Sequence, residues 1–281
     1  MGENMSLDGK KPEFKGQNSA FGENDTQSNL ANFKGQNSKL KDNLTSPKAL
    51  NPSTITNENP IESRYKRVSW LIGDEMLRIL GRLKVIIFGL GGVGGICVDA
   101  LYRTGFKDLT FVDADSFEST NLNRQLHSEH IGEAKARVFE RIYGGKGIVA
   151  CVDEGFLREF KLSNFDIIID AIDDIPAKVA LVRAVDMQRQ IFASSTGGAR
   201  RLDPTKIAIA PLYKTHTDAL AKKFRYELKK AGLKADFEVV FSDEKPLCRE
   251  LGSFMGVTAS FGLALASLIL RKVLEKYGTK C

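Results

Sequence analysis

The sequence lacks the cysteine patterns that mark a zinc-binding or disulfide-rich protein. Its 281 residues include only four cysteines, which lie far apart and form no CxxC pair: Cys97, Cys151, Cys248 and Cys281. A zinc site built from two CxxC pairs is therefore excluded. A disulfide framework is not expected either, and we interpret the thiols as ordinary groups of a protein in a reducing cytoplasm.

The sequence also lacks a basic start followed by an apolar run, so we expect no secretory signal. One later run without charge, residues 254–270 (FMGVTASFGLALASLIL), has 17 residues. This is just short of the about 20 needed to cross a bilayer. Its glycines and hydroxyls, and the basic RKVLEK that follows, favour a buried or dimer-interface helix. Stable membrane insertion is not expected, and peripheral membrane association through this helix stays an alternative.

Branched apolar residues are scarce in residues 1–60, which are rich in Asn, Ser, Lys and Gly. Such a segment cannot bury enough surface to offset its ordering entropy, so we expect a disordered polar tail. The hexapeptide FKGQNS occurs in it twice, at 14–19 and 33–38, which is too few and too polar for a solenoid. The folded domain is therefore expected to cover residues 61–281.

The net charge of +6 lies outside that tail, because the tail holds seven lysines and seven acids. Residues 200–234 alone contain ten Lys or Arg against three acids. This run is either a solvated helix face or a surface for a phosphate-rich partner.

From residue 61 onward, apolar runs of strand length alternate with amphipathic stretches of helix length. The expected strands are KVIIFG, LTFVDAD, IVACVDE, FDIIIDA, QIFAS and, later, KIAIAPL. The expected helices include GGICVDALYRTG, IPAKVALVRAVDMQR, a charged helix over 216–232 and an apolar helix near 258–274. This alternation predicts an α/β fold with a doubly wound, mostly parallel sheet, helices on both faces and a C-terminal strand and helix extension.

A glycine-rich turn, KVIIFGLGGVGG, places Gly89, Gly91 and Gly94 between a strand and a helix. Glycine allows the backbone to turn sharply and approach a phosphate, and the helix N-terminus offers free N–H groups. An acid, Asp113, follows 24 residues after Gly89 at the end of the next strand, where it can hold a ribose. The turn predicts nucleotide binding but does not separate NAD from ATP.

The stretch after Asp113, DADSFESTNLNRQ, favours ATP. An enzyme that forms an acyl adenylate must hold the phosphates while a carboxylate attacks the α-phosphorus, which requires cationic and amide donors. Asn121, Arg124 and Gln125 provide them, and Lys135 follows in IGEAK. Each of these residues taken singly would be interpreted as a surface residue.

A pair of carboxylates, Asp170 and Asp173 in DAIDD, ends the fourth expected strand. Ligands of parallel sheets bind beyond the carboxyl ends of the strands. We therefore expect Asp173 to reach a magnesium ion or the triphosphate.

Together, GLGGVG, DADSFESTNLNRQ, GEAK and DAIDD resemble the Rossmann-like, ubiquitin-activating-like adenylating enzymes of the ThiF/MoeB type. The resemblance implies a homodimer that binds Mg-ATP, with Asp113 on the ribose, Asn121, Arg124 and Lys135 on the phosphates, and Asp173 on magnesium. RYKR at 64–67 looks like the arm motif whose last arginine reaches the partner's phosphates. Arg124, Lys135 and Asp173 are the expected catalytic residues. The expected nucleotide site comprises Arg67, Gly89, Gly91, Gly92, Gly94, Asp113, Asp115, Asn121, Asn123, Arg124, Gln125, Lys135 and Asp173.

Within these enzymes, DAIDDIPAKVALV, STGGARRLDPTKIAIA and the basic helix are similar to the tRNA threonylcarbamoyladenosine dehydratases. The resemblance implies ATP-dependent cyclisation of the threonylcarbamoyl group through an adenylated carboxylate. It gives the basic run a partner in the tRNA backbone, with contacts expected from Arg200, Arg201, Lys222, Lys223, Arg225, Lys229 and Lys230.

Two other functions stay open at this point. Activation of the C-terminal glycine of a small sulfur-carrier protein would use the same ATP residues, but members of that kind commonly have the CxxC zinc pairs absent here. An NAD-dependent oxidoreductase is disfavoured by Asn121, Arg124 and Asp173. Cys248 in EKPLCRELGS is a minor candidate for a catalytic cysteine, and a sulfur-acceptor or desulfurase partner is possible.

Overall fold

The structure is a computed structural model that describes residues 61–278. The chain divides into two units, and the second, Asn59–Cys281, contains every element below. The expected tail over 1–60 and its FKGQNS repeat lie outside the described residues.

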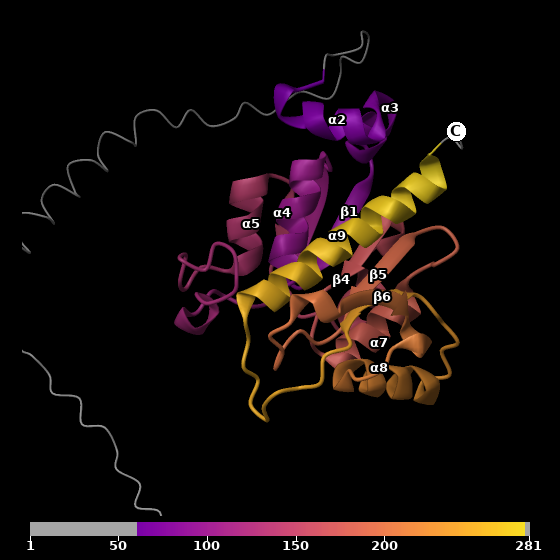
Figure 1. Cartoon of the computed structure of the whole chain (residues 1–281). Helices are drawn as coiled ribbons and strands as arrows, with labels where there is room; N and C mark the ends of the chain where they lie inside the picture. The colour runs from indigo at the N-terminus through magenta and orange to yellow at the C-terminus, as the bar shows by residue number, and fades with distance from the viewer. Residues whose placement is uncertain (1–60, 279–281) are drawn as a thin grey trace, which may run out of the picture. The chain divides into compact units, whose positions relative to one another are not determined.

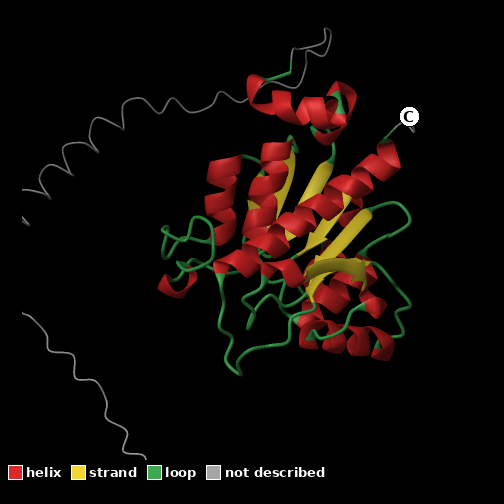
Figure 2. Ribbon diagram, in the orientation of Figure 1, coloured by secondary structure: helices red, strands yellow, loops and turns green. Residues whose placement is uncertain are grey.

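One sheet of seven strands runs through the domain, in the order β3-β2-β1-β4-β5-β7-β6 (Figures 1 and 2). All neighbouring strands are parallel except the edge strand β6, which is antiparallel to β7. This confirms the mostly parallel sheet. The strands are β1 (Lys84–Phe88), β2 (Asp108–Val112), β3 (Lys146–Ile148), β4 (Ile167–Asp170), β5 (Ile191–Ser195), β6 (Ile207–Pro211) and β7 (Glu238–Ser242).

Helices cover both faces of this sheet, because its central strands are apolar on both sides. In β1, Val85 and Ile87 belong to a core shared with α4, α5 and α9. Ile86 and Phe88, which point the other way, belong to a core shared with α6, α7 and α8. The doubly wound fold is therefore confirmed. The helices are α2 (Lys66–Ile72), α3 (Asp74–Leu80), α4 (Gly94–Thr104), α5 (Lys135–Tyr143), α6 (Glu154–Glu159), α7 (Ile175–Ala184), α8 (Ala219–Lys230) and α9 (Met255–Tyr277).

Two strand predictions need correction. The run IVACVDE was expected to be a strand, but β3 ends at Ile148 and the chain continues without regular structure to Asp153, which caps α6. The strand β7 was not predicted, although it lies between β5 and β6 and pairs with both.

The uncharged run of 254–270 forms most of α9. This helix is long and apolar enough to cross a membrane, with a mean hydropathy of 1.6, and half of its most apolar window is buried. It crosses one face of the sheet and packs on α4 (Figure 1). A Cβ at Gly262 would lie 2.5 Å from the Val93 carbonyl oxygen, so glycine permits this close crossing. Packing in the core therefore accounts for the lack of charge.

Candidate nucleotide-binding site

The glycine loop follows β1 and leads into α4, as predicted. Gly89 has φ +90°, and a Cβ there would lie 2.6 Å from the carbonyl oxygen of Ala171. A Cβ at Gly94 would overlap the carbonyl oxygen of Gly89. At Gly91, by contrast, a Cβ would meet only the Gln125 side chain, at 3.9 Å. The loop is thus fixed by close backbone contacts and open at Gly91, where a ligand can approach.

Asp113 holds this loop from the end of β2. Its Oδ2 accepts a hydrogen bond from the Leu90 N–H (2.6 Å), and its Oδ1 accepts one from the Asp115 N–H (2.8 Å). Burial raises the pKa of the Asp113 carboxyl, while these two hydrogen bonds and the charge of Lys135 act in the opposite direction. A carboxylate placed beside a glycine loop in this way suits an acceptor for ribose hydroxyls.

Lys135 begins α5 and is buried, with 4% of its surface exposed. Its Nζ lies 3.0 Å from Oδ2 of Asp115, whose side chain is 70% exposed. A buried ammonium therefore meets an exposed carboxylate at the mouth of the site. A phosphate can exchange for that carboxylate without leaving the lysine unpaired.

The residues 121–124 are held in a tight turn. Asn121 is buried, and its Oδ1 accepts a hydrogen bond from the Glu118 N–H (3.0 Å), which makes it part of a capping box. The Arg124 guanidinium donates to the Thr120 carbonyl and to Oδ1 of Asn123, both at 2.8 Å. Arg124 thus folds back on its own loop.

Gln125 carries a vacant hydrogen-bonding group beside the glycine loop. Its Oε1 is buried and has no hydrogen-bond partner within the described part of the chain. An unpaired buried amide oxygen is costly unless a ligand supplies a donor. Together with the open space at Gly91, this is the observation that best fits a bound nucleotide. Gly92 faces the other way, since its Cβ would meet the Thr258 hydroxyl of α9 at 3.1 Å.

The two carboxylates of DAIDD have different environments. Asp170 is fully buried and forms an ion pair with Nζ of Lys178 at 2.8 Å. Asp173 is exposed in the loop before α7. Among residues 61–278 no three His, Cys, Asp or Glu side chains gather into a metal site. Asp173 is the carboxylate of the pair that can meet a Mg²⁺ ion, and the ion would need nucleotide phosphates as further ligands.

Arg67 lies at the opposite end of the sheet from the glycine loop. It is exposed on α2, and α2 and α3 precede the amino end of β1 (Figure 1). The glycine loop follows the carboxyl end of the same strand. Arg67 is therefore remote from the nucleotide site of its own chain.

Of the seven predicted tRNA contacts, the structure exposes four and leaves Arg200 half-buried. Arg201 is 5% exposed and pairs with Asp218 at 3.4 Å, so it does not belong to an accessible surface. Arg225 is half-buried and donates to the Leu212 carbonyl at 3.2 Å. We call the remaining five the basic surface: Arg200, Lys222, Lys223, Lys229 and Lys230.

The buried side of α8 also differs in one residue from the prediction. Phe224 and Leu228 are buried as expected, but Ala221 takes the place assigned to Ala219, which is exposed. Leu220 is half-buried.

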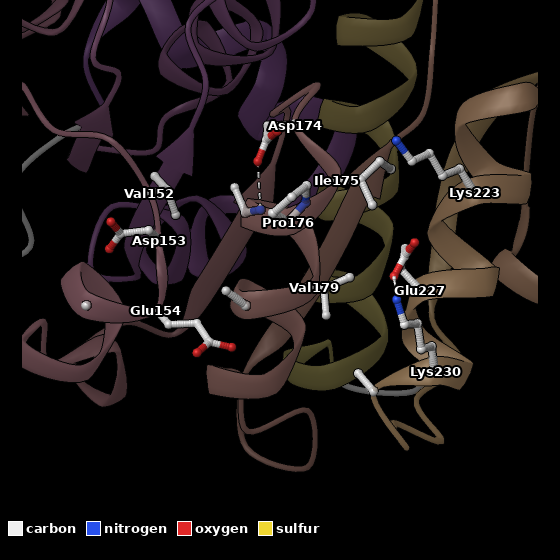
Figure 3. A pocket seen from close by; sticks show the side chains of 14 residues that line it. Val152, Asp153, Glu154, Asp174, Ile175, Pro176, Val179, Lys223, Glu227 and Lys230 are labelled. Carbon is white, nitrogen blue, oxygen red and sulfur yellow. Dashed lines mark hydrogen bonds and ion pairs between the residues drawn. The ribbon is translucent and has the colours of Figure 1, made fainter.

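A groove with a cavity volume of about 750 Å³ runs beside α8 (Figure 3). Lys223, Glu227 and Lys230 of α8 line one side, and Asp153 and Glu154 line the other. None of the predicted nucleotide residues lines it, so this groove is separate from the glycine loop.

The three described cysteines are free thiols in different settings. Cys97 is fully buried in α4, and burial raises the pKa of its thiol, which suits packing. Cys248 is exposed, and its thiol donates to the Glu250 carbonyl at 3.3 Å. Cys151 is exposed after β3.

A glycine loop, an acid and a buried lysine at the carboxyl ends of parallel strands define a doubly wound nucleotide-binding protein. The ThiF family pattern matches residues 65–280. The chain belongs to the ThiF family. The tRNA threonylcarbamoyladenosine dehydratase of Bacillus subtilis is 36% identical over 195 residues, which are 66% of this chain and 76% of the relative. The Haemophilus influenzae dehydratase is 30% identical over 248 residues, 76% of this chain and 95% of the relative.

A solved structure shows the same similarity. The Escherichia coli tRNA N6-threonylcarbamoyladenosine dehydratase in complex with ATP has a TM-score of 0.69 and 29% identity. The match covers 76% of this chain and 94% of that one. The resemblance inferred from the motifs is therefore confirmed.

Proposed function

We propose that the protein catalyses the ATP-dependent cyclodehydration of N6-threonylcarbamoyladenosine in tRNA through an adenylated carboxylate. The observation that carries this proposal is the similarity to tRNA threonylcarbamoyladenosine dehydratases, which covers 76% of this chain both in a relative and in a solved structure. The nucleotide site supports it, because Gly91 and the vacant Gln125 amide leave room and an acceptor for ATP.

In the proposed reaction a carboxylate oxygen of the threonylcarbamoyl group attacks the α-phosphorus of ATP, and pyrophosphate leaves. A nucleophile of the same substituent then attacks the acyl carbon and closes a five-membered ring, and AMP leaves. The net change is loss of water from the substrate. A free carboxylate is a poor acyl donor, whereas its mixed anhydride with AMP has a good leaving group. Because nucleophile and electrophile belong to one substituent, orientation is sufficient and no covalent enzyme intermediate is required.

In this proposal, the residues of the site contact different parts of ATP. Asp113 accepts from the ribose, and the glycine loop supplies N–H groups at the start of α4. Lys135, Arg124 and Asn121 stabilise the phosphates as charge develops on them. Asp173 would take part in binding Mg²⁺, which would neutralise phosphate charge.

We include a homodimer in the proposal, because Arg67 is too remote to serve its own chain. Beside it on α2, Trp70 and Leu71 are 72% and 78% exposed. Apolar side chains exposed in this way favour an interface. A second copy would cover them and bring Arg67 to the partner's phosphates.

The basic surface is the proposed contact with the tRNA backbone, and the groove in Figure 3 lies directly beside it. We place the protein in the cytoplasm, where tRNA and ATP are both available.

The test is mass spectrometry of nucleosides from tRNA that carries threonylcarbamoyladenosine, incubated with the protein and Mg-ATP. The proposal requires a product nucleoside that is lighter than the substrate nucleoside by one water, about 18 Da. One equivalent of pyrophosphate should form with each product. Pyrophosphate release that depends on a small carrier protein and not on tRNA would favour the alternative activity.

A further inference from the structure

The segment 243–254, which we call the Cys248 loop, is fastened to both sides of the proposed active site. On the nucleotide side, Nδ2 of Asn123 donates to the Ser253 carbonyl at 3.2 Å. On the other side, the Arg200 N–H donates to the Gly252 carbonyl at 2.7 Å. The loop therefore bridges the nucleotide loop and the start of the basic segment.

Arg201 anchors the beginning of the Cys248 loop from within the protein. Its Nε donates to the Glu244 carbonyl at 3.1 Å, and its Nη1 donates to the Gly197 carbonyl. Its Nη2 lies 3.4 Å from Oδ2 of Asp218, and both side chains are buried. One guanidinium thus connects three segments that are distant in sequence, which its planar fork of donors makes possible.

Asp218, the ion-pair partner of Arg201, also connects Arg201 to the start of α8. Its Oδ1 accepts from the Ala221 N–H at 2.9 Å, so it is the N-cap of α8. Its Oδ2 also accepts from the Thr196 hydroxyl at 2.7 Å, at the end of β5. The start of α8 is therefore fixed to the carboxyl edge of the sheet.

The hydrogen bonds at the carboxyl edge of the sheet continue toward the nucleotide site. Lys178 Nζ donates to the carbonyl of Ser195, the residue before Thr196, at 2.8 Å. The same ammonium pairs with Asp170, three residues before Asp173. The side chains of Lys178, Asp170 and Thr196 are buried, so water does not compete for their hydrogen bonds.

We propose that Arg201 and Asp218 are positioning residues that hold the Cys248 loop and the N-terminus of α8 in a fixed place relative to the nucleotide edge. The inference rests on the proposed function, since it assigns the pair to presenting tRNA to the activated nucleotide. Neither residue touches ATP or tRNA. Their effect passes through the two segments that they fasten.

The test uses the full-length protein and the double variant Arg201→Met/Asp218→Asn. Removing one partner alone leaves a buried charge unpaired and destabilises the fold, whereas removing both charges avoids this. Asn at 218 keeps an oxygen for the helix cap. The control is Lys272→Met/Glu238→Gln, which removes a partly exposed ion pair of 2.6 Å between α9 and the first residue of β7, at the end of that strand away from the Cys248 loop.

The first measurement is hydrogen–deuterium exchange, which does not depend on the substrate. We expect faster exchange in the double variant for residues 199–203, 243–254 and the first turn of α8, and unchanged exchange in β1 and β4. The second measurement is steady-state kinetics. We expect the KM for modified tRNA to rise roughly tenfold to hundredfold, with ATP affinity unchanged, because small displacements of a positioned substrate cost this much.

Exchange that is unchanged, or that rises equally across the domain, overturns the proposal, as does a wild-type KM for tRNA in an active double variant. If the wild-type protein itself fails to convert modified tRNA, the proposed function is wrong. The exchange pattern then still decides whether Arg201 and Asp218 fix these two segments.

Discussion

Reversing two charges of the basic surface, Lys222→Glu and Lys223→Glu, is expected to weaken tRNA binding and its dependence on salt. Each phosphate contact contributes a slope of about −0.7 (single strands) to −0.9 (duplex) in log K against log salt. If all five cations of the basic surface contact phosphates, the slope is about −3.5 to −4.5. The double variant keeps three contacts at most, for a slope of about −2.1 to −2.7.

These slopes give a large difference that is easily measured. Between 50 and 200 mM salt, wild-type affinity is expected to fall about 130- to 500-fold, and that of the variant about 20- to 40-fold. The assay is fluorescence anisotropy of labelled tRNA at a series of salt concentrations, with ATP affinity measured in parallel. ATP affinity should not change, because neither lysine lies at the glycine loop.

Stability should also change little. Lys222 and Lys223 are exposed, whereas the packing side of α8 is formed by Ala221, Phe224 and Leu228. Surface substitutions of this kind usually stay within about 0.5 kcal/mol.

The matched control is Arg82→Glu/Lys146→Glu, which makes the same change in net charge at exposed positions near the amino ends of β1 and β3. The control should keep the wild-type slope. If the Lys222/Lys223 variant keeps it as well, α8 is a solvated helix face and the proposed tRNA surface is wrong.

Three further outcomes are expected. Arg124→Ala should lower the rate of adenylate formation about 30- to 1000-fold, which is about 2–4 kcal/mol of lost transition-state stabilisation, while circular dichroism shows an intact fold. Lys178→Met should lower the melting temperature through a loss of about 3–5 kcal/mol, because it removes the partner of the buried Asp170 carboxylate; a small change would contradict a stabilising role for this ion pair. Burial lowers the pKa of His127, so the protein should lose stability as the pH falls from about 6.5 through the lowered value. Replacing His127 by Phe should remove this part of the pH dependence, measured by urea titrations at several pH values. An unchanged profile in the variant would contradict the assignment to His127.

The features that the sequence predicts well are those with a local cause. The glycine turn requires glycine because of backbone contacts at Gly89. The strands β1 and β4 contain the buried apolar runs 85–88 and 167–169, because both faces of a central parallel strand are buried. Asp113 is predictable for the same reason, since it is the first polar residue after a buried strand. Each of these signals lies within a few neighbouring residues, so it can be recognised without knowing which distant residues pack against it.

The strand β7 was not predicted from the sequence, because its strand conformation depends on the neighbouring strands β5 and β6. EVVFS is a short run, and the segment 243–254 separates it from the next helix, α9, so the repeating strand–helix pattern does not mark it. It is a central strand only because β5 leaves an open edge that β7 fills, in parallel, before β6 closes the sheet from the other side. The opposite error, extending a strand beyond Ile148, arose from an apolar alternation that here runs along the surface toward α6.

Charged residues show most clearly what the sequence alone does not decide. Arg201 and Lys222 lie in the same basic run, yet Arg201 is buried against Asp218 and Lys222 is exposed on α8. The charge of Arg201 is thus neutralised inside the protein and adds little to the field that a phosphate would meet. Lys178 is a similar case, because a lysine after an aspartate-rich loop is expected at the surface, but β4 carries Asp170 into the core directly beneath it. The net charge of a segment therefore exceeds the charge that a partner can reach, because some of its cations are paired inside the protein. Only the five accessible cations of the basic surface enter the expected salt slope.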